Sequence, residues 1–334
     1  MANLVEVRDL NVTFKTSEGL VYAVSGVNLD LAAGKTLALI GESGSGKSVT
    51  MKSLMRLHPP RKTTITGQIT VAGQDVLALD TRQLADLRGK DIAMVFQEPM
   101  LAFDPVFTIG DQIAEVVMRH EGCSYEVGRQ RALEMLECVH IPSPRRRLDA
   151  YPHEMSGGMR QRAMIALALA CRPQVLLADE PTTALDATVQ IQVLLLLREL
   201  QREFGMSMIF VTHDVGVAIE VADETAVMYA GRIIEQGPID TVMTDPWHPY
   251  TQGLLGATVY ANMDPDTRLA SIPGAPPQLY RQITECAFAP RCPHAMDACL
   301  EPLPPPTERG DRMARCLRLP EGVGTVPPAN ELSL

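Results

Sequence analysis

The segment that most limits what this chain can fold into is a glycine-rich loop, Gly41 to Ser48. It fits the pattern G-x-x-x-x-G-K-[ST] and lies between an apolar stretch at 36–40 and a segment with helix-forming residues. Glycines in such a loop let backbone N–H groups converge on phosphate oxygens where the helix begins. Lys47 is expected to reach the β- and γ-phosphates of a nucleotide, and the Ser48 hydroxyl to hold Mg²⁺. The loop therefore predicts an α/β domain of the P-loop nucleotide-binding type.

The length, composition and charge of the chain exclude several kinds of protein. The chain has 334 residues, of which 46% are hydrophobic and 21% charged, values that exclude a disordered or fibrous chain. Thirty Lys and Arg against 40 Asp and Glu leave a formal net charge of -10, so nucleic acid is not an expected partner. No apolar run approaches the roughly 20 residues of a bilayer span, and the acidic N-terminal segment does not fit a signal peptide. We expect a cytosolic protein that does not cross a membrane alone.

Several predicted strands end in polar residues. Alternating apolar residues at 5–14 predict a half-buried strand, and the continuous apolar runs 92–96, 175–178 and 208–212 predict parallel strands buried on both faces. The three runs are followed by Gln97, Asp179-Glu180 and His213. Open α/β sheets bind ligands at the carboxyl ends of their strands, so these side chains are candidates for the site.

The remaining chain divides by composition. A helical period between the second and third strands predicts an inserted helical subdomain at about 100–165. From Pro273 onward the composition changes, because 12 of the 25 prolines fall in 273–334 together with four of the seven cysteines. We therefore predict a nucleotide-binding domain at 1–262 and a separate C-terminal module with little regular structure at 263–334.

A second glycine-rich element lies far from the first. Ser156-Gly157-Gly158 opens a predicted helix that continues through 163–170, and its N–H groups could bind another anion. An ordinary N-cap by Ser156 is the alternative. Asp179 is placed to hold Mg²⁺, and Glu180 beside it can orient an attacking water.

These elements, in this order, resemble the nucleotide-binding subunits of ABC transporters over residues 4–245. In this resemblance Gly41 to Ser48 is the Walker A loop, Gln97 the Q-loop residue and Ser156 to Gln161 the signature motif. Val175 to Asp179 is Walker B, with Glu180 as its catalytic carboxylate. Ala184-Leu185-Asp186 is the D-loop, and His213 is the switch histidine. It implies a P-loop ABC cassette with a parallel-sheet core, an N-terminal antiparallel β subdomain, a helical insert and a small Cys/Pro-rich C-terminal module.

The resemblance also implies residue roles. The catalytic residues would be Lys47, Gln97, Glu180 and His213. The ligands of Mg²⁺ would be Ser48, Gln97 and Asp179. ATP would be bound by Phe14, Gly41, Ser43, Gly44, Ser45, Gly46, Lys47, Ser48, Val49, Ser156, Gly157, Gly158 and Gln161. Phe14 matches the aromatic position that stacks on adenine, with Tyr22 as the alternative.

The resemblance extends to the dipeptide and oligopeptide permease branch. It is carried by Gln97-Glu98-Pro99-Met100, Val227 to Gly231, His248-Pro249-Tyr250-Thr251 and the four late cysteines. Lys47-Ser48-Val49 resembles the first of two paralogous ATPase subunits, which implies a heterodimer. Membership of this branch implies two transmembrane permease subunits, indirect coupling to an extracytoplasmic solute-binding protein, and a peripheral location on the cytoplasmic face of the bacterial inner membrane.

The late cysteines, Cys286, Cys292, Cys299 and Cys316, are separated by five, six and sixteen residues. These gaps match neither the short zinc pattern nor ferredoxin spacing. A segment with few large apolar residues needs a staple to be ordered, and the resemblance suggests a [4Fe–4S] cluster held by these four thiolates. Zinc and the absence of any metal remain alternatives, and His294 is a possible substitute ligand.

Three functions are compatible with these motifs. The first is an ATPase that powers import of short peptides or similar small solutes. The second, a soluble ABC-type ATPase in DNA repair or translation, would show a long coiled-coil insertion or two cassettes, and this chain shows neither. The third is a redox or metal sensor on a nucleotide-binding scaffold, which the presence of Lys47, Asp179, Glu180 and His213 opposes.

Overall fold

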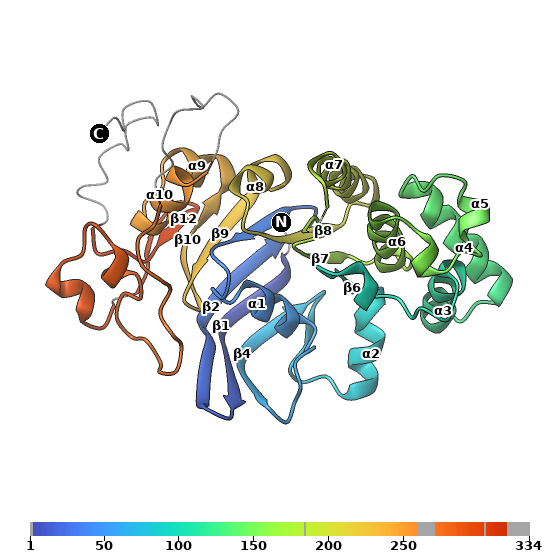
Figure 1. Ribbon diagram of the computed structural model, residues 1–334. Helices are drawn as coiled ribbons and strands as arrows, with labels where there is room; N and C mark the ends of the chain where they lie inside the picture. The colour runs from blue at the N-terminus through green and yellow to red at the C-terminus, as the bar shows by residue number, and fades with distance from the viewer. Residues whose placement is uncertain (1–2, 184, 259–270, 304, 319–334) are drawn as a thin grey trace.

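Two β-sheets and a helical region make up the fold (Figure 1). The structure, a computed structural model, describes residues 3–183, 185–258, 271–303 and 305–318. Within these ranges the smaller sheet has the order β2-β1-β4-β5, and the larger has the order β11-β12-β10-β9-β3-β8-β7-β6. The helical region lies at one side of the larger sheet and the C-terminal residues at the other (Figure 1).

The N-terminal sheet is antiparallel, as the alternating pattern predicts. Its strands are β1 (Asn3–Thr16), β2 (Gly19–Ala32), β4 (Thr63–Val71) and β5 (Gln74–Asp75). Alternate residues of β1, among them Val5 and Val7, are fully buried, because one face of the sheet packs on the core. β1 pairs with β2 on one side and β4 on the other, with register shifts in both pairings. These shifts increase the local twist of the sheet.

The centre of the larger sheet is parallel. It consists of β9 (Glu224–Tyr229), β3 (Thr36–Ile40), β8 (Ser207–Thr212), β7 (Val175–Asp179) and β6 (Ile92–Val95). Every residue of β3, β6, β7 and β8 is buried, which explains why these strands read as continuous apolar runs. Parallel pairing brings the carboxyl ends of these strands to one edge of the sheet.

Helices connect the strands. The described helices are α1 (Lys47–Leu54), α2 (Thr81–Lys90), α3 (Ile109–Glu121), α4 (Tyr125–Cys138), α5 (Pro144–Arg147), α6 (Gly157–Leu169), α7 (Ala187–Phe204), α8 (Val215–Val221), α9 (Ile239–Thr244) and α10 (Pro249–Gly256). Short 3₁₀ turns lie at Pro99–Leu101 (η1), Pro152–Glu154 (η2), Ala289–Arg291 (η3) and Asp297–Leu300 (η4). Helices α3 to α6 all lie between β6 and β7, in the stretch where the helical period appears in the sequence.

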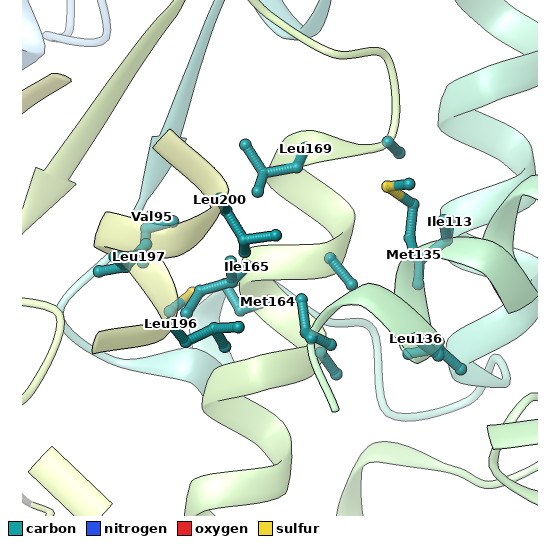
Figure 2. Packing of buried hydrophobic residues seen from close by; sticks show 14 of the residues in the cluster. Val95, Ile113, Met135, Leu136, Met164, Ile165, Leu169, Leu196, Leu197 and Leu200 are labelled. Carbon is teal, nitrogen blue, oxygen red and sulfur yellow. The ribbon is translucent and has the colours of Figure 1, made fainter. Parts of the chain in front are cut away.

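One apolar cluster joins this helical region to the sheet. It contains residues from β6, α3, α4, α6 and α7. Figure 2 labels Val95, Ile113, Met135, Leu136, Met164, Ile165, Leu169, Leu196, Leu197 and Leu200 of this cluster. Most of these side chains are essentially inaccessible to solvent. Because α6 contributes to the same cluster as strand β6, its N-terminus is held at a set position relative to the sheet edge.

The C-terminal residues extend the larger sheet. β10 (Arg232–Pro238) pairs with β9, and β12 (Arg312–Ala314) pairs antiparallel with β10 and with β11 (Thr307–Arg309). The segment therefore shares a sheet with the nucleotide-binding fold, although composition predicts a separate module. The predicted boundary between 262 and 263 lies outside the described residues. Among the described helices, none is long and apolar enough to span a bilayer.

Candidate ATP site

The loop between β3 and α1 requires glycine at two positions. Gly41 has φ 152° and Gly46 has φ 105°, both in the region that disfavours other residues. A Cβ atom on Gly41 would lie 2.1 Å from the carbonyl oxygen of Met228. One on Gly46 would lie 2.7 Å from the carbonyl oxygen of Ala23. The loop is therefore folded tightly against its neighbours, as the motif predicts.

Lys47 is the first residue of α1 and is held by this loop. Its Nζ donates to the carbonyl oxygens of Gly41 at 2.7 Å and Glu42 at 3.0 Å. Burial lowers the pKa of Lys47, while the carboxylates of Glu180 and Asp179 act in the opposite direction. The ammonium group is thus satisfied by the loop backbone and lies in the field of two acidic residues.

The remaining loop residues differ in exposure. Ser43 and Gly44 are exposed, and a Cβ atom on Gly44 would meet nothing within 4 Å. Ser45 is buried, and its Oγ has no hydrogen-bond partner among the residues that the structure describes. Val49 is half-buried against the apolar core. An exposed rim and an unsatisfied buried hydroxyl are compatible with a polar ligand in the loop.

Ser48 and Asp179 meet across 131 residues of sequence. The Ser48 hydroxyl donates to Oδ1 of Asp179 at 2.7 Å, at the end of β7. Burial raises the pKa of Asp179, and the Ser48 hydrogen bond acts in the opposite direction. Hydroxyl and carboxylate oxygens are ligands that Mg²⁺ prefers, so the side chains of Ser48 and Asp179 fit a magnesium ion.

Glu180 is the meeting point of three polar side chains. Its carboxylate lies 3.3 Å from Nδ1 of His213, accepts from the Thr183 hydroxyl at 3.0 Å, and lies 3.5 Å from Nε2 of Gln97. Glu180 also has φ 47°, a strained conformation for a residue with a side chain. The predicted residues at the ends of β6, β7 and β8 are therefore brought together. Thr183 was not predicted, although it lies three residues from Glu180.

The signature motif occupies the exposed beginning of α6. Ser156 caps the helix by accepting from the N–H of Met159 at 3.3 Å, so the N-cap alternative describes its local role. Gly157 is exposed, and a Cβ atom there would meet nothing within 4 Å. A Cβ atom on Gly158 would lie 2.9 Å from Cγ1 of Val189. Gln161 is buried, and its Nε2 has no partner. No described residue fills the open space at Gly157.

The two glycine-rich helix beginnings lie in different parts of the fold. α1 packs against β1, β2, β4, β7 and β8, whereas α6 packs against α3, α4, α7 and β6. The two helices therefore have different main packing partners, although both contact strands of the larger sheet.

Phe14 in β1 is half-buried and its ring lies edge-on to His58, with ring centroids 5.2 Å apart. A ring nitrogen of His58 lies 3.0 Å from the carbonyl oxygen of Val49, so Phe14 is close to helix α1. Tyr22 in β2 uses its backbone N–H to donate to Leu279 of the C-terminal segment. Of the D-loop, Leu185 and Asp186 are described, and Asp186 caps α7; Ala184 lies outside the described residues.

The late cysteines do not form a metal site. All four cysteines are free thiols, and they line one pocket together with His294. Burial raises the pKa of Cys286 to about 11 and also raises that of Cys292 and Cys316. In the described ranges, no three His, Cys, Asp or Glu side chains are grouped to hold a metal ion. The predicted [4Fe–4S] cluster is therefore contradicted, and zinc at Cys286, Cys292, Cys299 and Cys316 finds no support.

The C-terminal segment is attached to the rest of the fold by contacts that involve no metal. Phe288 packs against the rings of Tyr229 and Tyr250. Arg312 forms a buried ion pair with Glu235 at 3.2 Å. Aromatic packing and buried charge pairing therefore hold the segment on the fold. These pairings could not be predicted from the sequence, because their partners lie far apart in the chain.

The comparisons with known proteins agree with this geometry. The family described as "ABC transporter" matches residues 24–183, and "Oligopeptide/dipeptide transporter, C-terminal region" matches 234–299. A protein of Brucella abortus strain 2308, named as a peptide import ATP-binding protein, is 50% identical over 94% of this chain and 95% of its own. The oligopeptide transport ATP-binding protein OppD of Bacillus subtilis strain 168 is 48% identical over 91% of this chain and 86% of its own.

Solved structures show the same fold. A dimeric ATP-binding cassette in a post-hydrolysis state with ADP and Pi has a TM-score of 0.63 and 30% identity, over 70% of this chain and 98% of that one. The relatives and the fold support the transport ATPase among the three predicted functions, and they support neither the repair or translation ATPase nor the sensor. The chain belongs to the ABC transporter family of ATP-hydrolysing subunits, in the branch whose C-terminal region matches oligopeptide and dipeptide transporters.

Proposed function

We propose that this chain hydrolyses ATP to power the import of short peptides or similar small solutes through a membrane permease. The observation that carries the proposal is similarity along nearly the whole chain, C-terminal region included, to proteins named for peptide import and for dipeptide and oligopeptide transport. A relationship limited to the cassette would support ATP hydrolysis alone.

Each polar side chain of the site has a role in this proposal. Lys47, released from part of its contact with the loop carbonyls, binds the β- and γ-phosphates of ATP. Glu180 accepts a hydrogen bond from the attacking water and orients it toward the γ-phosphate. His213, at 3.3 Å from Glu180, holds that carboxylate and contacts the γ-phosphate. Phe14 stacks on the adenine ring.

The oxygens of Ser48 and Asp179, with the side-chain oxygen of Gln97, would hold Mg²⁺. Bound there, the ion supplies positive charge against the phosphate oxygens. Nε2 of Gln97 also lies 3.5 Å from the Glu180 carboxylate, and the helical region follows Gln97 in the chain. Gln97 is therefore placed between the catalytic carboxylate and the helical region.

The signature helix completes a site on a second subunit in this proposal. Its exposed first turn and the open space at Gly157 favour an anion, and none of the described residues supplies one there. Helix α1 after the phosphate loop and helix α6 pack mainly on different elements, which supports a site in which the two glycine-rich helix beginnings belong to different chains. A paralogous ATPase subunit therefore contributes the missing half of each site. Hydrolysis removes the γ-phosphate contact and releases the pair.

An exposed apolar surface next to Gln97 is where the permease would dock. Met100, Leu101, Val106 and Phe107 are 43%, 76%, 68% and 54% exposed. Exposed apolar side chains that form one contiguous patch are typical of a protein interface. We propose that they receive a cytoplasmic segment of the permease, which places the chain peripherally on the cytoplasmic face of the membrane. The binding protein outside the membrane contacts the permease alone.

The test is affinity purification of the full chain from its native membranes, with identification of the chains that co-purify. We expect two permease subunits and a second ATPase. Leu101→Glu should abolish recovery of the permeases, whereas Leu300→Glu, at a residue 65% exposed in the C-terminal segment, should not. Recovery of ribosomes or DNA-repair factors in place of permeases would overturn the proposal.

A further inference from the structure

The C-terminal segment places a buried arginine directly against the phosphate loop. Arg291, in η3, donates from Nη1 to Oε2 of Glu42 at 2.8 Å and from Nη2 to Oε1 at 3.0 Å. The Arg291 side chain is 6% exposed and that of Glu42 is 26% exposed. Two parallel charge-assisted bonds of this kind set the orientation of both groups as well as their separation. The two residues are 249 positions apart in the chain.

The other donors of Arg291 are also used. Nε donates to the carbonyl oxygen of Pro273 at 2.8 Å, and Nη1 lies 3.2 Å from the Tyr229 hydroxyl. The guanidinium group lies over the rings of Tyr229 and Phe288, 5.8 Å and 6.0 Å from their centroids. The Glu42 carboxylate raises the pKa of Arg291, so the arginine stays charged. It is thus a rigid group, and Glu42 is its carboxylate partner.

Glu42 is in turn bound to the residues that handle phosphate. Its backbone N–H donates to the Tyr250 hydroxyl at 2.8 Å. Its carbonyl oxygen accepts from Nζ of Lys47 at 3.0 Å and from the N–H of Ser45 at 3.2 Å. A shift of Glu42 therefore moves the oxygen against which Lys47 is aligned.

We propose that Arg291 is a positioning residue for ATP: through Glu42 it sets the phosphate loop and the Lys47 ammonium group, so the affinity of the loop for ATP depends on the C-terminal segment. The inference rests on ATP binding by the loop, and it adds that the region beyond the cassette takes part in that binding. A loop held in its binding conformation loses less conformational entropy when the nucleotide arrives.

This contact is separable from the attachment of the segment. Arg312 pairs with Glu235 at 3.2 Å, and β12 adds to the edge of β10. Because these anchors do not involve Arg291, the C-terminal segment stays attached when the Arg291–Glu42 pair is removed. An effect on ATP can thus be distinguished from loss of the segment.

The test compares ATP kinetics and melting temperature for the full chain assembled with its partner ATPase. Arg291→Gln and Glu42→Gln should each raise KM for ATP on the order of tenfold and change kcat little. The double variant should be no worse than either single one, because both remove the same coupling. Arg291→Lys, which keeps the charge but not the paired donors, should recover part of the loss.

Arg281→Gln is the matched control. Arg281, like Arg291, pairs with a glutamate, but its partner Glu285 lies in the C-terminal segment and not in the phosphate loop. This variant should leave KM unchanged. If Arg291→Gln does not fold, Glu42→Gln decides, because it leaves the other contacts of Arg291 in place. An unchanged KM in Glu42→Gln, or additive effects in the double variant, overturns the inference. The proposed import function is tested by co-purification with permeases, so either proposal can fail alone.

Discussion

At the scale of single residues, the site depends on backbone conformations that few side chains allow. Gly41 and Gly46 lie where any Cβ atom would collide with a neighbouring carbonyl, and Glu180 keeps a positive φ although it has a side chain. Strain of this kind persists only where surrounding contacts over-determine it, and here those contacts come from Thr183, His213 and Gln97.

The glycines of the phosphate loop should differ in their effect on stability. Gly41→Ala should lower the free energy of unfolding by more than about 3 kcal/mol, because the new Cβ atom would meet the Met228 backbone at 2.1 Å. Gly44→Ala should cost about 1 kcal/mol, the conformational cost alone, because its surroundings are open. Denaturant unfolding of both variants checks this, and equal losses would contradict the packing described for Gly41.

Glu180 should be needed for hydrolysis and not for ATP binding. Glu180→Gln keeps the shape of the side chain but removes the charge that orients water, so kcat should fall about 10²–10⁴-fold. The dissociation constant for ATP should change little, because Lys47 and the loop are untouched. Single-turnover hydrolysis and equilibrium binding measure the two effects, with the exposed Glu199→Gln as control. Full turnover by Glu180→Gln would assign the water-orienting role elsewhere.

At the scale of elements, helix α10 shows how the C-terminal part is built onto the cassette. His248 caps the helix, accepting from the Tyr250 N–H at 3.0 Å through Nδ1, and it is almost completely buried. The hydroxyl of Tyr250 then contacts the phosphate loop at Glu42. One short helix thus links the cap, the aromatic cluster and the loop.

Burial lowers the pKa of His248 to about 3, and this should make stability depend on pH. The unfolded chain takes up a proton below pH 6.5 while folded His248 stays neutral, so stability is full above pH 6.5 and falls as the solution is acidified toward pH 3. At pH 5 the loss from this group is about 2 kcal/mol.

His248→Asn keeps an acceptor for the helix cap and removes the titrating group. Its free energy of unfolding should therefore fall less between pH 7 and pH 5 than that of the natural chain. Denaturant unfolding at both pH values measures the difference, and His140→Asn, at an exposed position, is the control. If His248→Asn and the natural chain lose equal stability over this range, His248 does not remain neutral in the fold.

At the scale of the whole molecule, the phosphate loop and the signature helix are held in different parts of the structure (Figure 1). Helix α1, which follows the loop, packs on strands of both sheets, and α6 packs on helices α3, α4 and α7 and on strand β6. This separation is what a composite site between two subunits requires.

Gly157→Asp tests that arrangement. The new carboxylate has open space and lies in the first turn of α6, so the isolated chain should keep its melting temperature or gain up to about 1 kcal/mol of stability. Its ATP affinity should also be unchanged. Turnover by the assembled pair should fall at least about 10²-fold, because the carboxylate repels the γ-phosphate bound to the partner. Normal turnover in the reconstituted pair would show that this helix does not contact the nucleotide.

The local elements of the site could be predicted because their causes are local. Gly41 to Ser48 specify a loop through the conformations that glycine permits, and the apolar runs that became β6, β7 and β8 specify buried strands. Since parallel strands end at one edge, Gln97, Glu180 and His213 could be placed together from the sequence alone. Phe14 could be assigned only through resemblance, because an aromatic residue in a strand is ordinarily part of the core.

The pairings across the fold depended on tertiary structure. Arg291 meets Glu42, and β12 joins β10, because folding brings segments together whose separation in the chain carries no periodic signal. The cysteines show the opposite error: their crowding opposed incidental thiols and the family resemblance suggested a cluster, yet the described segment contacts the fold through aromatic packing and ion pairs. The sequence by itself determined the nucleotide loop, the strands and the ends of those strands, since backbone sterics and hydrophobic period act over a few residues. Only the tertiary structure decided what braces the loop, because a buried charge finds its partner through packing and not through spacing.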